Sequence, residues 1–174
     1  MEISKVFELP IEEYLKKIIK YIQERFYNVS VEECLVIKTK VKNGNTYFSS
    51  IRVQINDKQI KNFEHTDYVV RISECIIHKT MTTICTPKYS YELRKIDGTD
   101  LIRFDYKYYD RYPSHHINAI EKDWGNHLTF PDKTNINLEK IDCFKAIDIF
   151  CAYLKHPTEH ILDKTNNERY LKKI

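Results

Sequence analysis

The sequence predicts an α+β fold: a single antiparallel, curved β-sheet meander flanked by an N-terminal and a C-terminal helix. Two observations support this expectation. The period of the apolar residues changes from about 3.6 to about 2 after residue 34, and it returns to about 3.6 at Leu138. Between these points, turn signals recur at the short spacing that joins neighbouring antiparallel strands. The length of 174 residues fits a single domain over residues 1–174 with its own core.

The first expected helix covers residues 10–27. Pro10 suits a helix start, and Glu12 and Glu13 place negative charge in the first turn. Apolar residues then recur at spacings of three and four: Ile11, Leu15, Ile18, Ile19, Ile22 and Phe26. An amphipathic helix with such a stripe packs its apolar side against the rest of the fold.

The antiparallel sheet is expected over residues 34–130. Its strand-forming runs are residues 35–41, 47–55, 68–80, 81–96, 101–109 and 115–119. Asn43-Gly44 lies between the first two alternating runs and is a strong hairpin signal. Pro87 interrupts a later run, which predicts a bulge or an edge position there. Asp97-Gly98 marks the turn before the next strand.

The second expected helix covers residues 138–155. Asn137 is suited to cap its N-terminus, and the helix should stop before Pro157. The following residues, 158–174, carry a few apolar positions spaced for a short, weak helix. We expect this tail to be partly ordered.

Composition excludes several classes of function. The formal charge is only +3, from 28 basic and 25 acidic residues, so nucleic-acid binding would need a local basic patch. The chain has 3 glycines, too few for the glycine-rich loops that cradle phosphates, so no nucleotide cofactor is expected. No apolar run approaches the roughly 20 residues of a membrane span, and the first residues lack the pattern of a signal peptide. We therefore expect a cytoplasmic protein with no membrane partner.

The chain has an odd number of cysteines with no C-x-x-C spacing: Cys34, Cys75, Cys85, Cys143 and Cys151. This pattern favours reduced cysteines that fill the core. A catalytic cysteine is a minor alternative, because the sequence places none of them beside a base.

Residues 100–131 concentrate the side chains that are capable of chemistry. In a strand that begins at Leu101, alternation places Arg103, Asp105 and Lys107 on one face. In the next strand, His116 and Asn118 share a face, and His115 lies on the other with apolar residues. We favour His116 over His115 as the reactive histidine, and we expect the two strands to share one polar face.

His127 begins a short apolar run that is expected to pair beside the His115–Ala119 strand, which would bring two imidazoles together. Two imidazoles and a cation suffice for metal-independent RNA cleavage, with a base, an acid and a charge that holds the phosphorane. The predicted catalytic residues are His116, His127, Arg103, Asp105 as the group that orients an imidazole, and His115. The predicted substrate-binding residues are Lys107, Tyr109, Arg111, Tyr112 and Asn118, with the tyrosines stacking on unpaired bases.

Other interpretations of the same residues stay open. Histidines near a sheet edge are often only solvated, and Arg-X-Asp on a strand is commonly a surface ion pair worth about 1 kcal/mol or less. A metal site built from His115, His116, His127 and Asp105 or Asp110 is a minor alternative, because adjacent histidines on a strand diverge. A second function is a non-catalytic module that binds a protein or single-stranded nucleic acid. Exposed strand edges also favour a homodimer.

The segments LIRFDYKYYD, PSHHINA and HLTFP, followed by a helix that begins with NLEKI, resemble the TumE-type toxins of toxin–antitoxin systems. Arg103-Phe104-Asp105 matches the Arg-aromatic-Asp strand of that family, and Pro113-Ser114-His115-His116 matches its histidine-rich segment. The family usually has a further alternating histidine where this chain has Ile117 and Asn118. The resemblance covers roughly the second half of the chain. It implies a small cytoplasmic sheet protein that acts as a ribonuclease toxin on RNA and is held inactive by an antitoxin protein.

Overall fold

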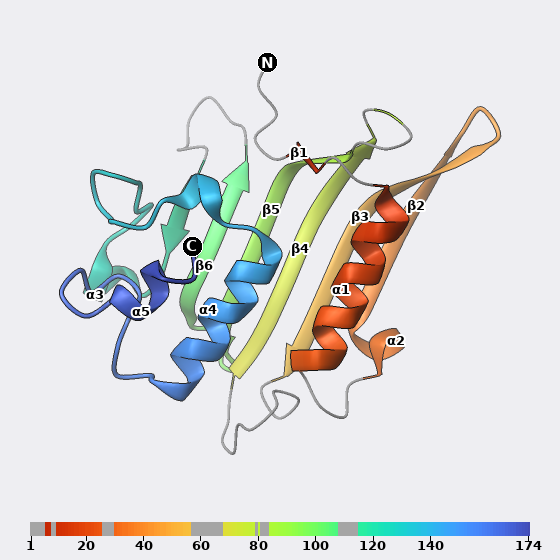
Figure 1. The fold of residues 1–174 in the computed structure, drawn as a ribbon. Coiled ribbons are helices and arrows are strands. Elements are labelled where there is room, and N and C mark those ends of the chain that lie inside the picture. Colours follow the sequence, from red (N-terminus) through yellow and green to blue (C-terminus); the bar gives the residue numbers. More distant parts are fainter. Residues whose placement is uncertain are drawn as a thin grey trace.

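The structure is a computed structural model that describes residues 6–7, 10–25, 30–56, 68–78, 80, 84–107 and 115–174. It confirms the predicted α+β class, with one antiparallel sheet and helices against it (Figure 1). The strands are β2 (Leu35–Lys42), β3 (Asn45–Asn56), β4 (Tyr68–His78), β5 (Ile84–Lys95), β6 (Asp100–Lys107) and β7 (His115–Asn118). They lie side by side in chain order, which is the expected meander. A short strand, β1 (Val6–Phe7), pairs with the beginning of β5.

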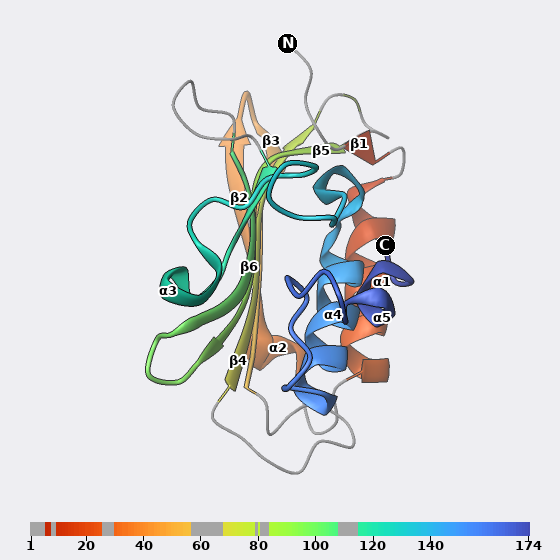
Figure 2. The same ribbon diagram turned by 90° about the vertical axis from the view of Figure 1, so that its left-hand side faces the viewer.

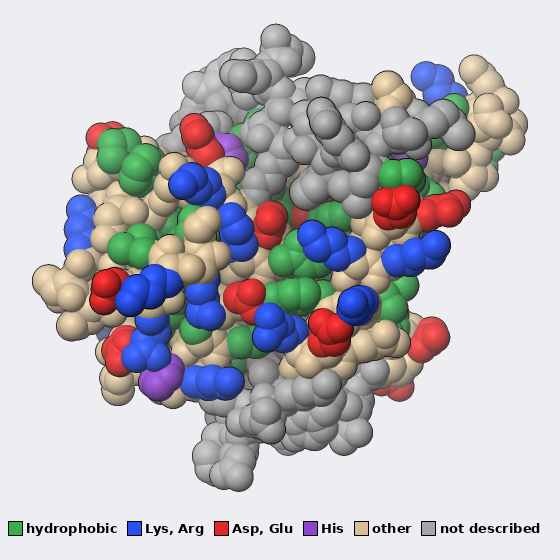
Figure 3. Space-filling model, in the orientation of Figure 1, with side chains coloured by type: hydrophobic (Ala, Val, Ile, Leu, Met, Phe, Trp, Pro, Cys, Tyr) green, Lys and Arg blue, Asp and Glu red, His purple; other side chains and the backbone are tan. Residues whose placement is uncertain are grey.

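Both long helices, α1 (Ile11–Arg25) and α4 (Cys143–Lys155), cover the same face of the sheet (Figure 2). Their outward side carries interspersed positive and negative side chains and no large patch of one sign (Figure 3). The shorter helices are α2 (Val31–Cys34), α3 (Glu121–Trp124) and α5 (Glu168–Leu171). No helix in the described ranges is long and apolar enough to cross a membrane.

Turns and bulges follow the chemistry of the residues that form them. Asn43 and Gly44 both have positive φ, 52° and 76°, as a type I′ hairpin between β2 and β3 requires. Gly98 has φ 94° in the turn between β5 and β6. Around Pro87 the register with β4 shifts, so the interruption in the sequence is a β-bulge.

The core lies between the sheet and the two long helices. Strand alternation sends Ile51, Val53 and Ile55 from β3 into it, and Phe104 of β6 stacks on Phe150 of α4 with ring centroids 5.8 Å apart. Burying each such side chain contributes about 1.5–3 kcal/mol relative to leaving it exposed. Neither of the two long helices that the structure describes covers the opposite face of the sheet (Figure 2). That face, called the open face below, carries the polar members of each alternating strand.

One carboxylate is buried in the core. Glu74 of β4 is 2% exposed, and its two oxygens accept hydrogen bonds from the Tyr14 hydroxyl at 2.7 Å and the Tyr91 hydroxyl at 2.5 Å. The Tyr14 hydroxyl also lies 3.3 Å from the Cys143 sulfur at the start of α4. These contacts join α1, β4, β5 and α4, and burial raises the pKa of both tyrosines well above the usual value.

The C-terminal part differs from the sequence-based expectation in two ways. The segment predicted as one helix over 138–155 is a 3-10 turn (Leu138–Lys140) followed by α4, whose N-cap is Asp142 and not Asn137. Asn137 instead accepts a hydrogen bond from Glu139 within the 3-10 turn. The tail packs closely on the body of the protein, where Ile161 and Tyr170 are fully buried.

Candidate functional site

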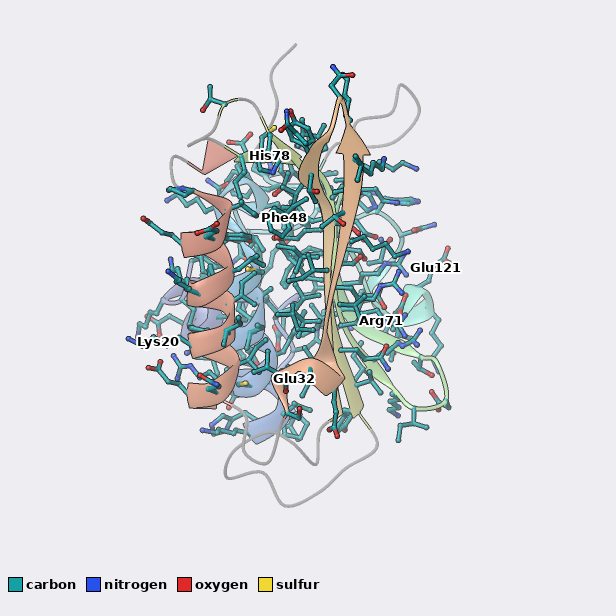
Figure 4. The ribbon with its side chains drawn as sticks, turned by 90° about the vertical axis from the view of Figure 1, so that its right-hand side faces the viewer. Lys20, Glu32, Phe48, Arg71, His78 and Glu121 are labelled. Atoms are coloured by element: carbon teal, nitrogen blue, oxygen red, sulfur yellow. The ribbon has the colours of Figure 1, made fainter. Side chains whose placement is uncertain are left out.

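The open face of the sheet is polar and hollowed. Described residues line a hollow of about 800 Å³ on it, including the cations Lys38, Arg52, Arg71, Lys88, Arg103 and Lys107 and the carboxylates Glu92 and Asp105. In Figure 4, Arg71 lies on the side of the sheet away from α1, whereas Phe48 lies on the side that faces α1. The hollow is therefore bordered by more positive than negative side chains, although the whole chain is nearly neutral.

Strand register arranges the open face in rows that cross the sheet. The central row consists of Arg52, Ser73, Ser90, Asp105 and His116, one residue from each of β3 to β7. The row on one side of it consists of Gln54, Arg71, Glu92, Arg103 and Asn118. The sequence-based expectation that two strands share one polar face is thus confirmed, because His116 is directly opposite Asp105 and Asn118 is opposite Arg103.

The row on the other side, called the lysine row below, consists of Lys38, Ser50, Cys75, Lys88 and Lys107. It contains three cations and no carboxylate. Lys88 and Lys107 are directly opposite each other on β5 and β6, and like charges in this position destabilise a sheet by themselves. An anion bound between them would be attracted by both ammonium groups, so the lysine row has the charge pattern of a site for phosphate groups.

Arg103 is held by two carboxylates. Its Nε donates to Asp105 Oδ2 at 2.7 Å, and its Nη1 donates to Asp100 Oδ2. Burial acts to lower the pKa of Arg103, but the neighbouring carboxylates outweigh it and the pKa is raised. The guanidinium stays charged, yet much of its charge is balanced by Asp100, a partner that sequence alternation does not reveal.

The contact with Asp100 depends on a bulge in β6. Leu93 pairs with Ile102 and Arg94 pairs with Asp100, which leaves Leu101 as an extra residue. The bulge moves Asp100 to the open face, where strict alternation would have placed it toward the core. Sequence periodicity could not find this residue, because nothing in the pattern of residues 100–107 marks a bulge.

The predicted imidazole pair is formed by His116, which lines the hollow at β7, and His127 beside it. Leu128 forms a β-bridge with Ile117, and the rings of His116 and His127 meet edge to face with centroids 4.8 Å apart. The backbone of His127 has φ 48°, a conformation that is uncommon for a residue other than glycine, and it is held there beside the bridge. The two rings therefore come together from separate segments, as the sequence predicted.

Asp105 joins the imidazole pair to Arg103. Its Oδ2 lies 3.8 Å from His116 Nε2 and accepts a hydrogen bond from the Asn118 amide at 2.9 Å. His116 is 7% exposed and lines the hollow. At this distance the Asp105 carboxylate faces the His116 ring and can orient it.

His115 is on the opposite side of β7, as alternation predicts. Its ring lies 4.4 Å from the ring of Tyr106, and its Nδ1 is 3.1 Å from the Tyr89 hydroxyl. The sheet therefore separates the His115 imidazole from His116 and Arg103, and His115 lies apart from the other predicted catalytic residues. The side chain instead packs with the tyrosines of the core face.

The tyrosines that the structure describes near the site pack in the core. Tyr89 stacks on Tyr91 with ring centroids 4.3 Å apart, and both are buried with Tyr106 on the core face. Tyr109, Arg111 and Tyr112, predicted to bind substrate, lie outside the described residues, as does Asp110.

His160 is a structural histidine that the sequence analysis did not single out. Its Nδ1 accepts from the Leu162 amide at 3.2 Å, so its Nε2 carries the proton and donates to the Leu101 carbonyl at 3.0 Å. The ring stacks on Trp124 with centroids 4.6 Å apart. Burial lowers its pKa, and these contacts fix the tail against β6.

The cysteines are reduced in the structure. Cys34, Cys85 and Cys143 are buried as expected, and Cys151 is partly buried, but Cys75 is exposed in the lysine row. Among the residues that the structure describes, no group of three or more His, Cys, Asp or Glu is arranged to hold a metal ion.

Comparison with models of protein families, with curated protein sequences and with solved structures finds no match. The resemblance to TumE-type toxins, the antitoxin partner and the homodimer therefore stay predictions from the sequence. Evidence on function comes from the geometry of the open face.

Proposed function

We propose that the protein is a metal-independent ribonuclease that binds single-stranded RNA on its open face and cleaves it beside the His116–His127 pair. The observation that carries this proposal is the contact of these two imidazoles, whose ring centroids are 4.8 Å apart. His116 lies next to Asp105, and both line a hollow with more cations than carboxylates. An imidazole pair beside a phosphate-binding surface is the minimum that the chemistry requires.

The hollow suits a single strand. Its volume of about 800 Å³ is in the range of pockets that hold small ligands, and it accommodates a short stretch of unpaired nucleotides but no duplex. Lys38, Lys88 and Lys107 would contact phosphate oxygens, while the hydroxyls of Ser73 and Ser90 would contact sugar or phosphate. Binding of this kind tracks the backbone and reads little sequence.

The chemistry divides between the two imidazoles. One neutral imidazole removes the proton of the ribose 2′-hydroxyl, and the 2′-oxygen forms a bond to phosphorus. The bond between phosphorus and the 5′-oxygen breaks, and the protonated imidazole donates its proton to that leaving oxygen. The products are a 2′,3′-cyclic phosphate and a 5′-hydroxyl. Asp105, whose Oδ2 is 3.8 Å from His116 Nε2, would orient the His116 ring for this proton transfer.

A second candidate, an RNA-binding module without catalysis, is supported by a different observation. Arg103 forms ion pairs with Asp100 and Asp105, and these carboxylates balance much of the charge that it could offer to a phosphorane. Arg103 is therefore less suited to catalysis than its position in the sequence predicted. In the proposed ribonuclease, Lys107 and Lys88 take over the role of holding the phosphate, and Arg103 positions Asp105.

The test is cleavage of an end-labelled single-stranded RNA in the presence of a chelator. The proposal predicts cleavage with a bell-shaped dependence of rate on pH, and a loss of about 100-fold or more in His116→Gln and in His127→Gln. The matched control is His156→Gln, since His156 is exposed beyond the end of α4 and far along the chain from the site.

Three outcomes separate the candidates. Cleavage that is lost in both site variants and kept in the control supports the ribonuclease. If RNA binds but stays intact at high protein excess, the RNA-binding module without catalysis is supported. RNA that neither binds nor is cleaved removes both candidates.

A further inference from the structure

The strand β2 is the outer edge of the sheet. It pairs with β3 on one side, and among the described strands none pairs with its other side. Seven of its eight residues are exposed. Figure 1 shows the β2–β3 hairpin reaching beyond the N-terminal end of α1, so its outer part is not covered by that helix. A long exposed edge presents backbone N–H and C=O groups that pair readily with another strand.

The side chains of β2 are both apolar and basic. Val36, Ile37 and Val41 are 50%, 36% and 73% exposed, which is unusual for three β-branched residues on one strand. Lys38, Lys40 and Lys42 stand among them and are exposed too. Lysines on an edge strand usually protect it from pairing with another chain. Such protection does not explain why three apolar side chains are exposed on the same strand.

The β2–β3 hairpin carries charges of one sign only. From residue 35 to residue 56 the chain has four cations, Lys38, Lys40, Lys42 and Arg52, and no Asp or Glu. The hairpin thus has a formal charge of +4, which exceeds the +3 of the whole chain. A partner for this edge must carry negative charge.

We propose that the β2 edge binds an extended acidic segment of another protein, which adds to the sheet as a further strand. The segment alternates acidic and apolar side chains, so that carboxylates meet the lysines on the open face and apolar side chains cover Ile37 and Val41 on the other face. Backbone hydrogen bonds supply the pairing, and side-chain complementarity supplies the choice of partner.

Charge argues against the two other occupants. A second copy that pairs its own β2 in antiparallel fashion would bring lysines against lysines, and like charges opposite each other destabilise a sheet. RNA has the required negative charge, but it has no peptide backbone that could pair with β2. It would also leave the β-branched side chains of β2 exposed. The proposal concerns the edge and is independent of cleavage on the open face, with which it shares Lys38 and Val36 at the border.

The test uses an N-acetylated peptide of alternating glutamate and valine, as long as the eight residues of β2, added to the ¹⁵N-labelled full chain. We expect saturable binding with the largest amide shifts in residues 36–42. The same peptide with alternate backbone amides methylated keeps its charge but cannot complete the strand ladder, and we expect it not to bind. A lysine–valine peptide should not bind either.

Variants locate the site. Lys40→Glu/Lys42→Glu should weaken binding of the acidic peptide by about tenfold or more, since attraction becomes repulsion at two positions. Lys16→Glu/Lys164→Glu makes the same charge change at exposed positions away from β2 and should leave binding unchanged. Equal binding of the methylated peptide, absence of saturable binding, or a dimer of the chain joined through β2 would each overturn the proposal.

Discussion

The two faces of the sheet each hold a carboxylate in a different setting. Glu74 faces the helices, is 2% exposed, and accepts hydrogen bonds from two neutral tyrosine hydroxyls. Asp105 faces the open side and is surrounded by a guanidinium, an amide and an imidazole. The first set of partners joins helices to strands, and the second set borders a hollow that a ligand can enter.

The residue type alone therefore does not define a site. A carboxylate held by hydroxyls in the core stabilises packing, because its removal leaves buried donors without an acceptor. A carboxylate that contacts an arginine and a histidine at the border of a hollow is placed to orient these groups toward a ligand. Substitutions on the two faces should therefore separate stability from function.

The largest expected effect is on the core face. Glu74→Ala should lower the free energy of unfolding by about 3 kcal/mol, because the hydroxyls of Tyr14 and Tyr91 lose their buried acceptor. Urea unfolding measures the change. Glu92→Ala removes a carboxylate of the open face and should cost about 1 kcal/mol or less. Equal losses in the two variants would contradict the distinction between the faces.

The next effect is on the open face. Lys38→Ala/Lys88→Ala should weaken binding of single-stranded RNA by about tenfold at low salt and leave stability nearly unchanged. The slope of log affinity against log salt should decrease in magnitude by about 1.4, which is two phosphate contacts on a single strand. Lys16→Ala/Lys164→Ala is the matched control. An unchanged salt slope would show that the lysine row does not contact phosphate.

The smallest effect is a dependence of stability on pH through His160. Burial lowers its pKa in the folded protein, so the unfolded chain takes up a proton at a higher pH than the folded protein does. This contribution to stability is complete above the usual histidine pKa of about 6.5, and it is lost as the pH falls from there toward the folded pKa.

Unfolding at about pH 8 and about pH 5.5 measures this contribution. His160→Gln should be less stable than the wild type at the higher pH and should lose less stability between the two conditions. His156→Gln, at an exposed position, should keep the wild-type dependence. If His160→Gln retains the full dependence, other groups are responsible for it.

Much of the fold follows from periodicity and turn chemistry. The Asn43-Gly44 hairpin and the shared face of Asp105 and His116 need only the strand period and the φ preferences of the residues. The approach of His127 to His116 was predictable because the second segment is short, apolar and close in sequence.

Other features depend on contacts that periodicity does not encode. The bulge at Leu101 brings Asp100 to Arg103 and changes how much charge Arg103 offers a substrate. The buried Glu74 has no local signal, since its partners Tyr14 and Tyr91 come from other elements. The tail is fixed by His160 and by buried residues such as Tyr170, whose contacts form only once the sheet and α4 are in place.

The most direct test of the proposed ribonuclease uses two oligonucleotides that differ at one sugar. One is RNA throughout, and the other has 2′-deoxyribose on the 5′ side of the mapped cleavage position. In chelator, the proposal predicts that the first is cut to a 2′,3′-cyclic phosphate and that the second stays intact, with the activity absent in His127→Gln. Cleavage of both at equal rates, or of neither, would contradict the assignment of this site to RNA cleavage.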